Sequence, residues 1–224
     1  MVVSTEDRRP IQQLDDDTIG HIAAGEVVER PAQVVKELVE NSIDAGANRI
    51  RVEIERGGFD LISVIDDGGG IPSSELELAI TRHATSKLAT AIDLSAIHTL
   101  GFRGEALASI GMVSSLKVSS RHGDLEGMKI SVDDGAKKPL EPAGIAPGTI
   151  IEVRNLFANI PARLSFQKRP SIESAAIVDI VMSQALCNPT IGFTVTIDGR
   201  SVLETPPSVV MADRLFDLIG APAE

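Results

Sequence analysis

The sequence of 224 residues has no tryptophan, no tyrosine and a single cysteine, Cys187. One cysteine excludes an internal disulfide framework and any metal site built from several thiolates. Because free cysteines are among the most buried residue types, and Cys187 falls near the end of a predicted helix, we expect a buried, inert thiol. The four histidines are too scattered in sequence to indicate a zinc site; they are His21, His83, His98 and His122.

Long apolar runs and an excess of positive charge are also missing. The longest apolar runs are far shorter than the ~18 to 20 residues that a membrane-spanning helix needs, and the polar start lacks the apolar core of a signal peptide. We therefore expect a cytoplasmic protein without membrane contacts. With 32 acidic and 21 basic residues, the formal net charge is −11. Strong binding to a phosphate backbone is disfavoured, because it depends on clustered lysine and arginine, whereas weak or partner-assisted DNA contact stays open.

Hydrophobic periodicity predicts helices early and strands late in the chain. A short helix begins near Asp15 and ends about Gly25, and a second helix has Pro31 in its first turn. Residues 48–70 read as a hairpin of two strands, and one later helix spans about 171–187. Four more strand-like segments are expected at 114–121, 127–134, 148–157 and 192–204. This order indicates an α/β (α+β) two-layer sandwich, in which a mixed, mainly antiparallel sheet carries helices on one face.

Composition shifts suggest three parts. Residues 1–13 are polar and are expected to form a loose arm, and residues 14–207 are expected to form the main domain. The proline pair in TPPS, 205–208, reads as a linker, so residues 208–224 are expected to begin a second domain. We find no internal repeat.

Familiar phosphate-binding signatures are missing as well, but the stretch DDGGG, 66–70, suggests another kind of ligand site. The chain has no Gly-Lys pair for a P-loop, and Ser73 stands where a dinucleotide-binding fingerprint needs glycine. Asp66, at the end of a predicted buried strand, has the acceptors to bind an amino group, and the glycines let a flat ligand approach the backbone. A plain tight turn is the simpler interpretation of this motif taken alone.

Two further stretches contain residues suited to a nucleotide. In GFRGEALASI, 101–110, two glycines lead into a helix that starts around Glu105, and free N–H groups at a helix start suit a terminal phosphate. A helix start behind a mobile loop explains this stretch equally well. RHATSKL, 82–88, offers two hydroxyls and Lys87, which by themselves read as a solvated helix end.

The most informative pattern is VVKELVENSIDAGA, 34–47. At 100° per residue, Glu37, Asn41 and Asp44 lie within about 60° of arc, directly beside the apolar face. An ordinary solvated face would lie opposite. A carboxylate and a carboxamide at positions i and i+4 suit a general base beside a metal ligand. Glu37 would orient or deprotonate water, and Asn41 would give its carbonyl oxygen to Mg²⁺.

Taken together, these residues resemble the N-terminal ATPase domain of the MutL mismatch-repair family. That family lies within the wider GHKL (Bergerat-fold) group of gyrase B, histidine kinases and heat-shock chaperones. The resemblance covers about residues 11–224, and its motifs occur in the MutL order at 22–47, 82–87, 101–110 and 156–163. Two stretches depart from the family pattern. Asp67 replaces a more usual asparagine, and LSFQKRP, 164–170, is less basic than usual, which weakens any inference of DNA binding.

The resemblance implies a role for each matching position. Glu37 activates water, Asn41 is the Mg²⁺ ligand that touches the triphosphate, and Asp44 supports the pocket. Asp66 holds the adenine amino group with help from Thr149, and LFANIPAR shapes the sheet edge more than it touches ATP. The remaining nucleotide-binding positions, with those from Phe102 to Leu107 forming a lid, are Gly70, Thr85, Ser86, Lys87, Gly101, Phe102, Arg103, Gly104, Glu105, Ala106 and Leu107.

The implied function is Mg²⁺-dependent binding and slow hydrolysis of ATP, acting as a conformational switch in DNA mismatch repair. ATP would order the lid and arm, two domains would associate, and hydrolysis would reset them. The implied partners are a second MutL-type chain, a MutS-type mismatch-recognition protein, and DNA, weakly or through the complex. The family's second domain gives a lysine to the terminal phosphate, so without it we expect poor turnover.

Three rival interpretations remain. A topoisomerase or chaperone ATPase is disfavoured by the MutL-type motifs GFRGEAL and RHATSK. A histidine kinase is disfavoured because we expect no helix with a phosphoacceptor histidine before the domain. A non-catalytic interaction module would bind its partner without dependence on Glu37.

Overall fold

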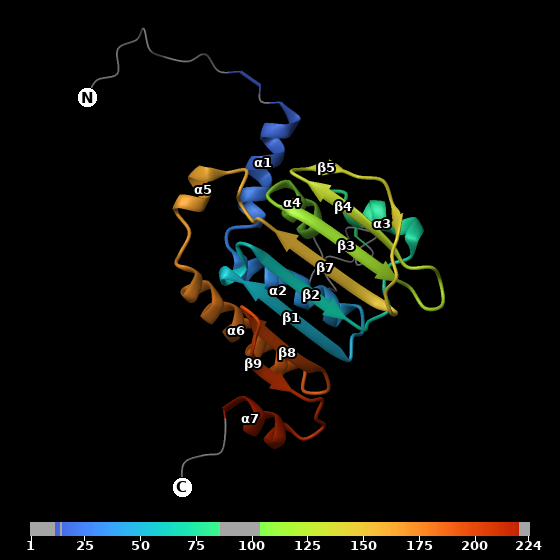
Figure 1. Ribbon diagram of the computed structural model, residues 1–224, viewed down its shortest axis with the longest axis vertical. Helices are drawn as coiled ribbons and strands as arrows, with labels where there is room; N and C mark the ends of the chain where they lie inside the picture. The colour runs from blue at the N-terminus through green and yellow to red at the C-terminus, as the bar shows by residue number, and fades with distance from the viewer. Residues whose placement is uncertain (1–11, 14, 86–103, 220–224) are drawn as a thin grey trace, which may run out of the picture.

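The computed structural model describes residues 12–13, 15–85 and 104–219 (Figure 1). The helices are α1 (Asp16–Val27), α2 (Pro31–Asp44), α3 (Ser73–Ala79), α4 (Ala106–Met112), α5 (Pro161–Ser165), α6 (Pro170–Cys187) and α7 (Met211–Ile219), with a short 3-10 turn, η2 (Arg56–Gly58). The strands are β1 (Arg49–Glu55), β2 (Leu61–Asp66), β3 (Ser115–Arg121), β4 (Met128–Asp133), β5 (Ala136–Lys137), β6 (Glu141–Pro142), β7 (Gly148–Arg154), β8 (Gly192–Ile197) and β9 (Arg200–Thr205).

All these strands belong to one mixed sheet. Its order is β5-β4-β3-β7-β2-β1-β8-β9, with β6 paired to β4. The pair β1 and β8 is parallel, and every other described pair is antiparallel. The expected hairpin of β1 and β2 is present, with Ile50 opposite Asp66. The predicted mixed, mainly antiparallel architecture is therefore confirmed.

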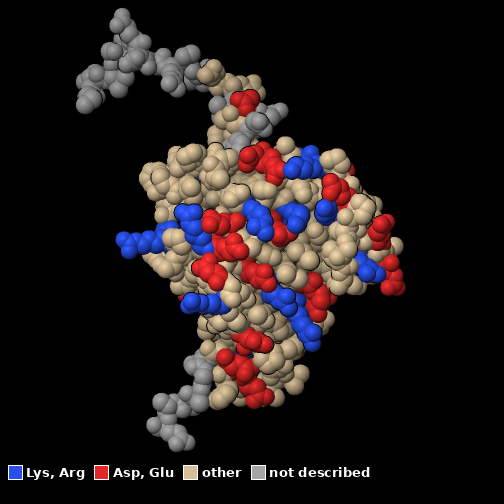
Figure 2. Space-filling model, viewed as in Figure 1, with Lys and Arg blue, Asp and Glu red and all other residues tan. Residues whose placement is uncertain are grey.

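The two faces of the sheet differ in character. In β1, Ile50, Val52 and Ile54 are buried while Arg49 and Arg51 are exposed, as alternation of side chains requires. Helices α2, α4 and α6 pack on the apolar face, behind the sheet in Figure 1. Lysines, arginines and acidic residues intermingle on the side of the molecule that faces the viewer in Figure 2.

An ion-paired carboxylate lies on β7. Glu152 pairs with Lys117 of β3 and with Arg154 of its own strand, whose Nη2 is 3.2 Å from Oε1. Partial burial alone would raise the pKa of Glu152, but these two cations lower it below its usual value. Glu152 is therefore ionised at neutral pH and paired to two cations.

The structure corrects three expectations. The segment 192–204, expected as one strand, is the hairpin of β8 and β9, because Asp198 and Gly199 adopt positive φ and turn the chain. Helix α5 was not expected, since five residues are too few to show a helical pattern of apolar side chains. Cys187 is exposed, because the buried stripe of α6 is formed by Ile177, Val181 and Ala185, and position 187 lies on the opposite side.

Both early helices begin as expected. Asp15 caps α1, its Oδ1 accepting the N–H of Thr18 at 2.7 Å. This helix ends at Val27, two residues beyond the predicted end, and Pro31 occupies the first turn of α2. None of the helices in the described ranges is long and apolar enough to cross a lipid bilayer.

Helix α7 lies against α6 and β9. Its Arg214 is fully buried and donates from Nη2 to the carbonyl oxygens of Pro189 and Ile191, at 2.6 and 2.7 Å. Burial lowers the pKa of this guanidinium below its ordinary value. The division of the chain near residue 207 stays a prediction.

Candidate nucleotide site

Helix α2 supplies the first wall of the candidate site. Its buried residues include Val34, Val35, Leu38 and Val39, while Glu37, Asn41 and Asp44 are half-buried beside them. The helical-wheel prediction for this edge is therefore confirmed, although the roles assigned to the three side chains stay predictions. At the helix start, Gln33 donates from Nε2 to the carbonyl oxygen of Val27 at 2.7 Å, which satisfies a carbonyl at the end of α1.

Asp66 ends β2 and is 9% exposed. Ser42 of α2 donates its hydroxyl to Oδ2 at 2.8 Å, and the N–H of Gly68 donates to Oδ1 at 3.0 Å. Burial raises the pKa of Asp66 above the ordinary 3.8, although the donors from Gly68, Ser42 and Thr149 oppose that rise. The carboxylate is thus held by neutral groups, without a cation beside it among its named partners.

A row of polar residues crosses three neighbouring strands at this point. Asp66 of β2 stands opposite Thr149 of β7, and Thr149 stands opposite Ser120 of β3. The hydroxyl oxygens of Ser120 and Thr149 are 3.0 Å apart. Ser120 also accepts the N–H of Ile71 at 2.7 Å, so this row fastens the turn that follows Asp66 to the sheet.

The turn itself is fixed by backbone contacts. Asp67 accepts the N–H groups of Asn48 and Arg49 on Oδ1, at 2.7 and 2.8 Å. An asparagine has an equivalent oxygen, which explains why the departure from the family pattern at this position is harmless to the turn. Gly70 has φ +68°, and a Cβ there would lie 2.1 Å from the carbonyl oxygen of Arg121. Only glycine fits this position.

The two remaining motifs meet beside α4. His83 Nδ1 is 3.0 Å from Oε1 of Glu105, the residue that precedes α4. Gly104 has φ +62°, and a Cβ there would lie 2.5 Å from the carbonyl oxygen of Ala84. Thr85, Ala106 and Leu107 are half-buried near this junction. Ser86, Lys87, Gly101, Phe102 and Arg103 lie outside the described residues.

Sequence reasoning missed two residues of the site, Ser42 and Ser120. Ser42 directly follows Asn41, but its partner Asp66 comes from a different element. Ser120 is identified only by the strand register that sets it opposite Thr149. A buried serine that forms such a hydrogen bond has no local sequence signal, because its partner lies on another element of the fold.

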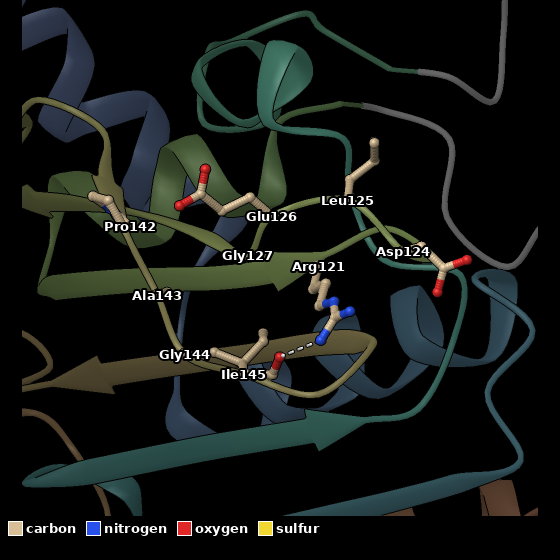
Figure 3. Close-up of a pocket in the computed structure, with 9 residues that line it drawn as sticks. All are labelled: Arg121, Asp124, Leu125, Glu126, Gly127, Pro142, Ala143, Gly144 and Ile145. Atoms are coloured by element: carbon tan, nitrogen blue, oxygen red, sulfur yellow. Dashed lines mark hydrogen bonds between the residues drawn. The ribbon is translucent and has the colours of Figure 1, made fainter.

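A separate cavity of about 580 Å³ lies beyond the turn, between residues 121–127 and 142–145 (Figure 3). Arg121 points toward Ile145 and donates from Nη1 to its carbonyl oxygen at 3.5 Å. None of the predicted site residues within the described ranges lines this cavity. Arg121 lines this cavity and also gives the carbonyl oxygen that closely approaches Gly70.

The donor set near α2 suits Mg²⁺ together with a phosphate group. The described residues contain no cluster of three or more His, Cys, Asp or Glu side chains able to enclose a metal. Mg²⁺ does not need one, because it commonly takes one or two protein oxygens and fills its octahedron with phosphate oxygens and water. A single amide oxygen from Asn41 fits that pattern.

The comparisons with known proteins agree with this geometry. Residues 29–141 match the family described as histidine kinase-, DNA gyrase B-, and HSP90-like ATPase. A MutL protein from Chelativorans sp. (strain BNC1) is 50% identical over 94% of this chain, and one from Mesorhizobium japonicum is 52% identical over 88%. The chain spans about a third of the length of these relatives, 34% and 31% respectively.

The solved structures add the same result at the level of the fold. The Aquifex aeolicus MutL ATPase domain complexed with ADP is 34% identical, with a TM-score of 0.74, over 88% of this chain and 72% of that one. The N-terminal domain of a DNA repair protein has a TM-score of 0.77 at 29% identity, over 91% of this chain and 60% of that one. The fold and the family match thus define a domain of the histidine kinase, gyrase B and HSP90-like ATPase class. Within that class, the chain belongs to the MutL family.

Proposed function

We propose that this chain binds ATP with Mg²⁺ and hydrolyses it to ADP and phosphate, as the ATPase part of a MutL-type mismatch-repair protein. The observation that carries the proposal is the link between α2 and the turn after β2. The Ser42 to Asp66 hydrogen bond of 2.8 Å joins the helix that holds Glu37 and Asn41 to the carboxylate assigned to adenine. The ADP complex of the Aquifex aeolicus relative supports a nucleotide as the ligand.

Asp66 would recognise the base. An ionised carboxylate is an acceptor with about four lone-pair sites, and the named donors leave room for one more. The amino group of adenine would donate to it, whereas the carbonyl oxygen of guanine at the equivalent position would be repelled. Thr149 and the turn with Gly70 would hold the flat ring against the backbone.

Glu37 and Asn41 would act at the phosphates. Glu37 would orient a water molecule and accept its proton as that water attacks the terminal phosphorus. Asn41 would present its amide oxygen to the metal, and Mg²⁺, when bound, would neutralise charge on the triphosphate. Asp44, on the same edge of α2, would support the pocket.

For the whole protein, the proposal is a nucleotide-controlled switch. Contacts with the triphosphate exist only in the closed form, so ATP shifts the population toward it. The partners we propose are a second MutL-type chain, a MutS-type protein, and DNA through the complex, in the cytoplasm.

The test is equilibrium binding of a fluorescently labelled ATP analogue, since the chain has no tryptophan or tyrosine. We expect Mg²⁺-dependent binding, lost in Asn41→Ala and unchanged in the exposed control Asn48→Ala. Glu37→Ala should keep the nucleotide and lose hydrolysis. Absence of Mg²⁺-dependent binding by folded wild-type protein would refute the proposal. Partner binding that is indifferent to Glu37→Ala would instead favour an interaction module.

A further inference from the structure

The end of α1 and its connection to α2, residues 25–30, are held by side chains from a distant part of the chain. Arg163 of α5 donates from Nη1 to the carbonyl oxygen of Val28 at 2.9 Å and from Nη2 to that of Gly25 at 3.0 Å. Gln167 donates from Nε2 to the carbonyl oxygen of Glu29 at 3.1 Å. These bonds satisfy carbonyls that the end of α1 leaves without helical partners.

The guanidinium of Arg163 is itself held in place. It lies over the ring of Phe157, 5.6 Å from the centroid, and that ring is fully buried. The planar fork of arginine reaches two carbonyl oxygens at once while stacking on an aromatic face, and a lysine ammonium does not reproduce this arrangement. Arg163 therefore has a geometric task that its charge alone would not fulfil.

Gly25 is shaped to receive this side chain. A Cβ at position 25 would lie 2.1 Å from Nη2 of Arg163 and 2.7 Å from its Cζ. The residue is in the last turn of α1, where alanine would otherwise be the better helix former. Glycine at this position is thus explained by the guanidinium.

The carbonyls that Arg163 binds lead directly into α2. Pro31 begins that helix three residues after Val28, and Glu37 follows six residues later, about 9 Å along the axis. The far end of α2 is fastened separately by the hydrogen bond from Ser42 to Asp66. A shift at the connection would consequently move Glu37 more than it moves Asn41, which lies next to the fixed end.

We propose that Arg163 is a positioning residue for ATP hydrolysis: it fixes the start of α2 and thereby the place of Glu37 relative to the terminal phosphate. This rests on the proposed function for the reaction, but the placement of α2 by Arg163 is testable without nucleotide. LFANIPAR, expected to shape the sheet edge, would then also act on the catalytic helix.

The first experiment compares Arg163→Lys with the control Arg169→Lys, an exposed arginine of the same segment. Amide hydrogen exchange over residues 32–37, without nucleotide, should quicken about tenfold in Arg163→Lys, with little change over 42–44. In single-turnover experiments, the rate constant for hydrolysis of bound ATP should fall about tenfold while the Kd for the ATP analogue changes less than about threefold, because in-line attack tolerates misplacement less than binding does.

The second variant acts from the other side of the contact. Gly25→Ala should reproduce both effects of Arg163→Lys, since the new methyl group displaces the guanidinium. Unchanged exchange over 32–37 in both variants would overturn the proposal, whether or not ATP binds. A lower melting temperature with unchanged exchange, single-turnover rate constant and Kd would show a merely structural role. Failure of wild-type protein to bind ATP would refute the proposed function, and the exchange comparison would still decide the role of Arg163.

Discussion

Two buried carboxylates hold the two ends of α2 in different ways. Asp66 receives Ser42 near the end of the helix, and its named partners are neutral donors. Glu173, in the first turn of α6, is fully buried and accepts Nε of Arg30, the residue before α2, at 3.1 Å. Burial raises the pKa of Asp66, whereas Glu173 has a cation within reach.

The difference indicates that Asp66 serves ligand binding, whereas Glu173 serves to hold α2 and α6 together. A buried carboxylate without a cation is costly, and it persists where another donor completes its shell. The charge of an ion-paired carboxylate at a helix N-terminus is offset by its partner and by the helix dipole, although Oε1 of Glu173 accepts no hydrogen bond from the described residues. The two carboxylates should therefore respond oppositely to substitution, one in ligand affinity and the other in stability.

The largest effect is expected at Asp66. Asp66→Asn should weaken binding of the ATP analogue about 100-fold, since loss of a charged acceptor costs roughly 1.5 to 3 kcal/mol and the new amide can oppose the adenine amino group. Fluorescence titration measures this. Asp67→Asn is the matched control, and it should bind normally because its amide oxygen can still accept the N–H groups of Asn48 and Arg49. Equal affinity in Asp66→Asn would remove the base-recognition role.

Glu173→Gln should act on stability instead. We expect the free energy of unfolding to fall by about 1 to 3 kcal/mol, because the Arg30 guanidinium keeps a buried but uncharged partner. Urea denaturation followed by circular dichroism measures the change, with exposed Glu204→Gln as control. Nucleotide affinity should stay within about twofold under conditions where the variant is folded. A large loss of affinity without loss of stability would erase the contrast with Asp66.

Acid should separate the two roles of Asp66. Its pKa lies above 3.8, so as pH falls the charge is lost earlier than on an ordinary aspartate, and binding should weaken through that raised pKa. The sign for stability is opposite. Its contribution to the free energy of unfolding is largest below 3.8 and declines as pH rises through the folded pKa. The test is to measure the affinity for the ATP analogue at pH values from 7 downward. The affinity of Asp66→Asn should not change with pH in this way, since the variant lacks the titrating carboxyl group.

The smallest effect is expected at Ser42. Ser42→Ala removes one donor to the carboxylate, so it should weaken binding about fivefold and move the acid midpoint of binding upward. Ser183→Ala, an exposed serine on α6, is the control. A downward shift of the midpoint would contradict the hydrogen bond as described.

Sequence alone placed α2 and the end of β2 well, because their patterns are local. Alternation in β1 and the half-buried edge of α2 follow from periods of two and 3.6 residues. It did not identify Ser42, Ser120 or the task of Arg163, since their partners are set by register and by contacts between distant segments. The β8–β9 turn was missed because Asp198 adopts positive φ inside an otherwise strand-like run. The exposure of Cys187 was missed because this residue lies on the side of α6 away from the buried stripe.

The parallel pairing of β1 with β8 has a consequence for folding. β2 follows β1 directly, so the β1–β2 hairpin can form early. The pairing of Ile50 with Phe193 in β8 can form only after the much later synthesis of β8. Pairings so distant in sequence form slowly because loop closure precedes any gain from contact. Until residues 192–197 have emerged, one edge of β1 stays unpaired and open to association with other chains. We expect aggregation during synthesis to depend on this edge more than on any surface of the finished fold.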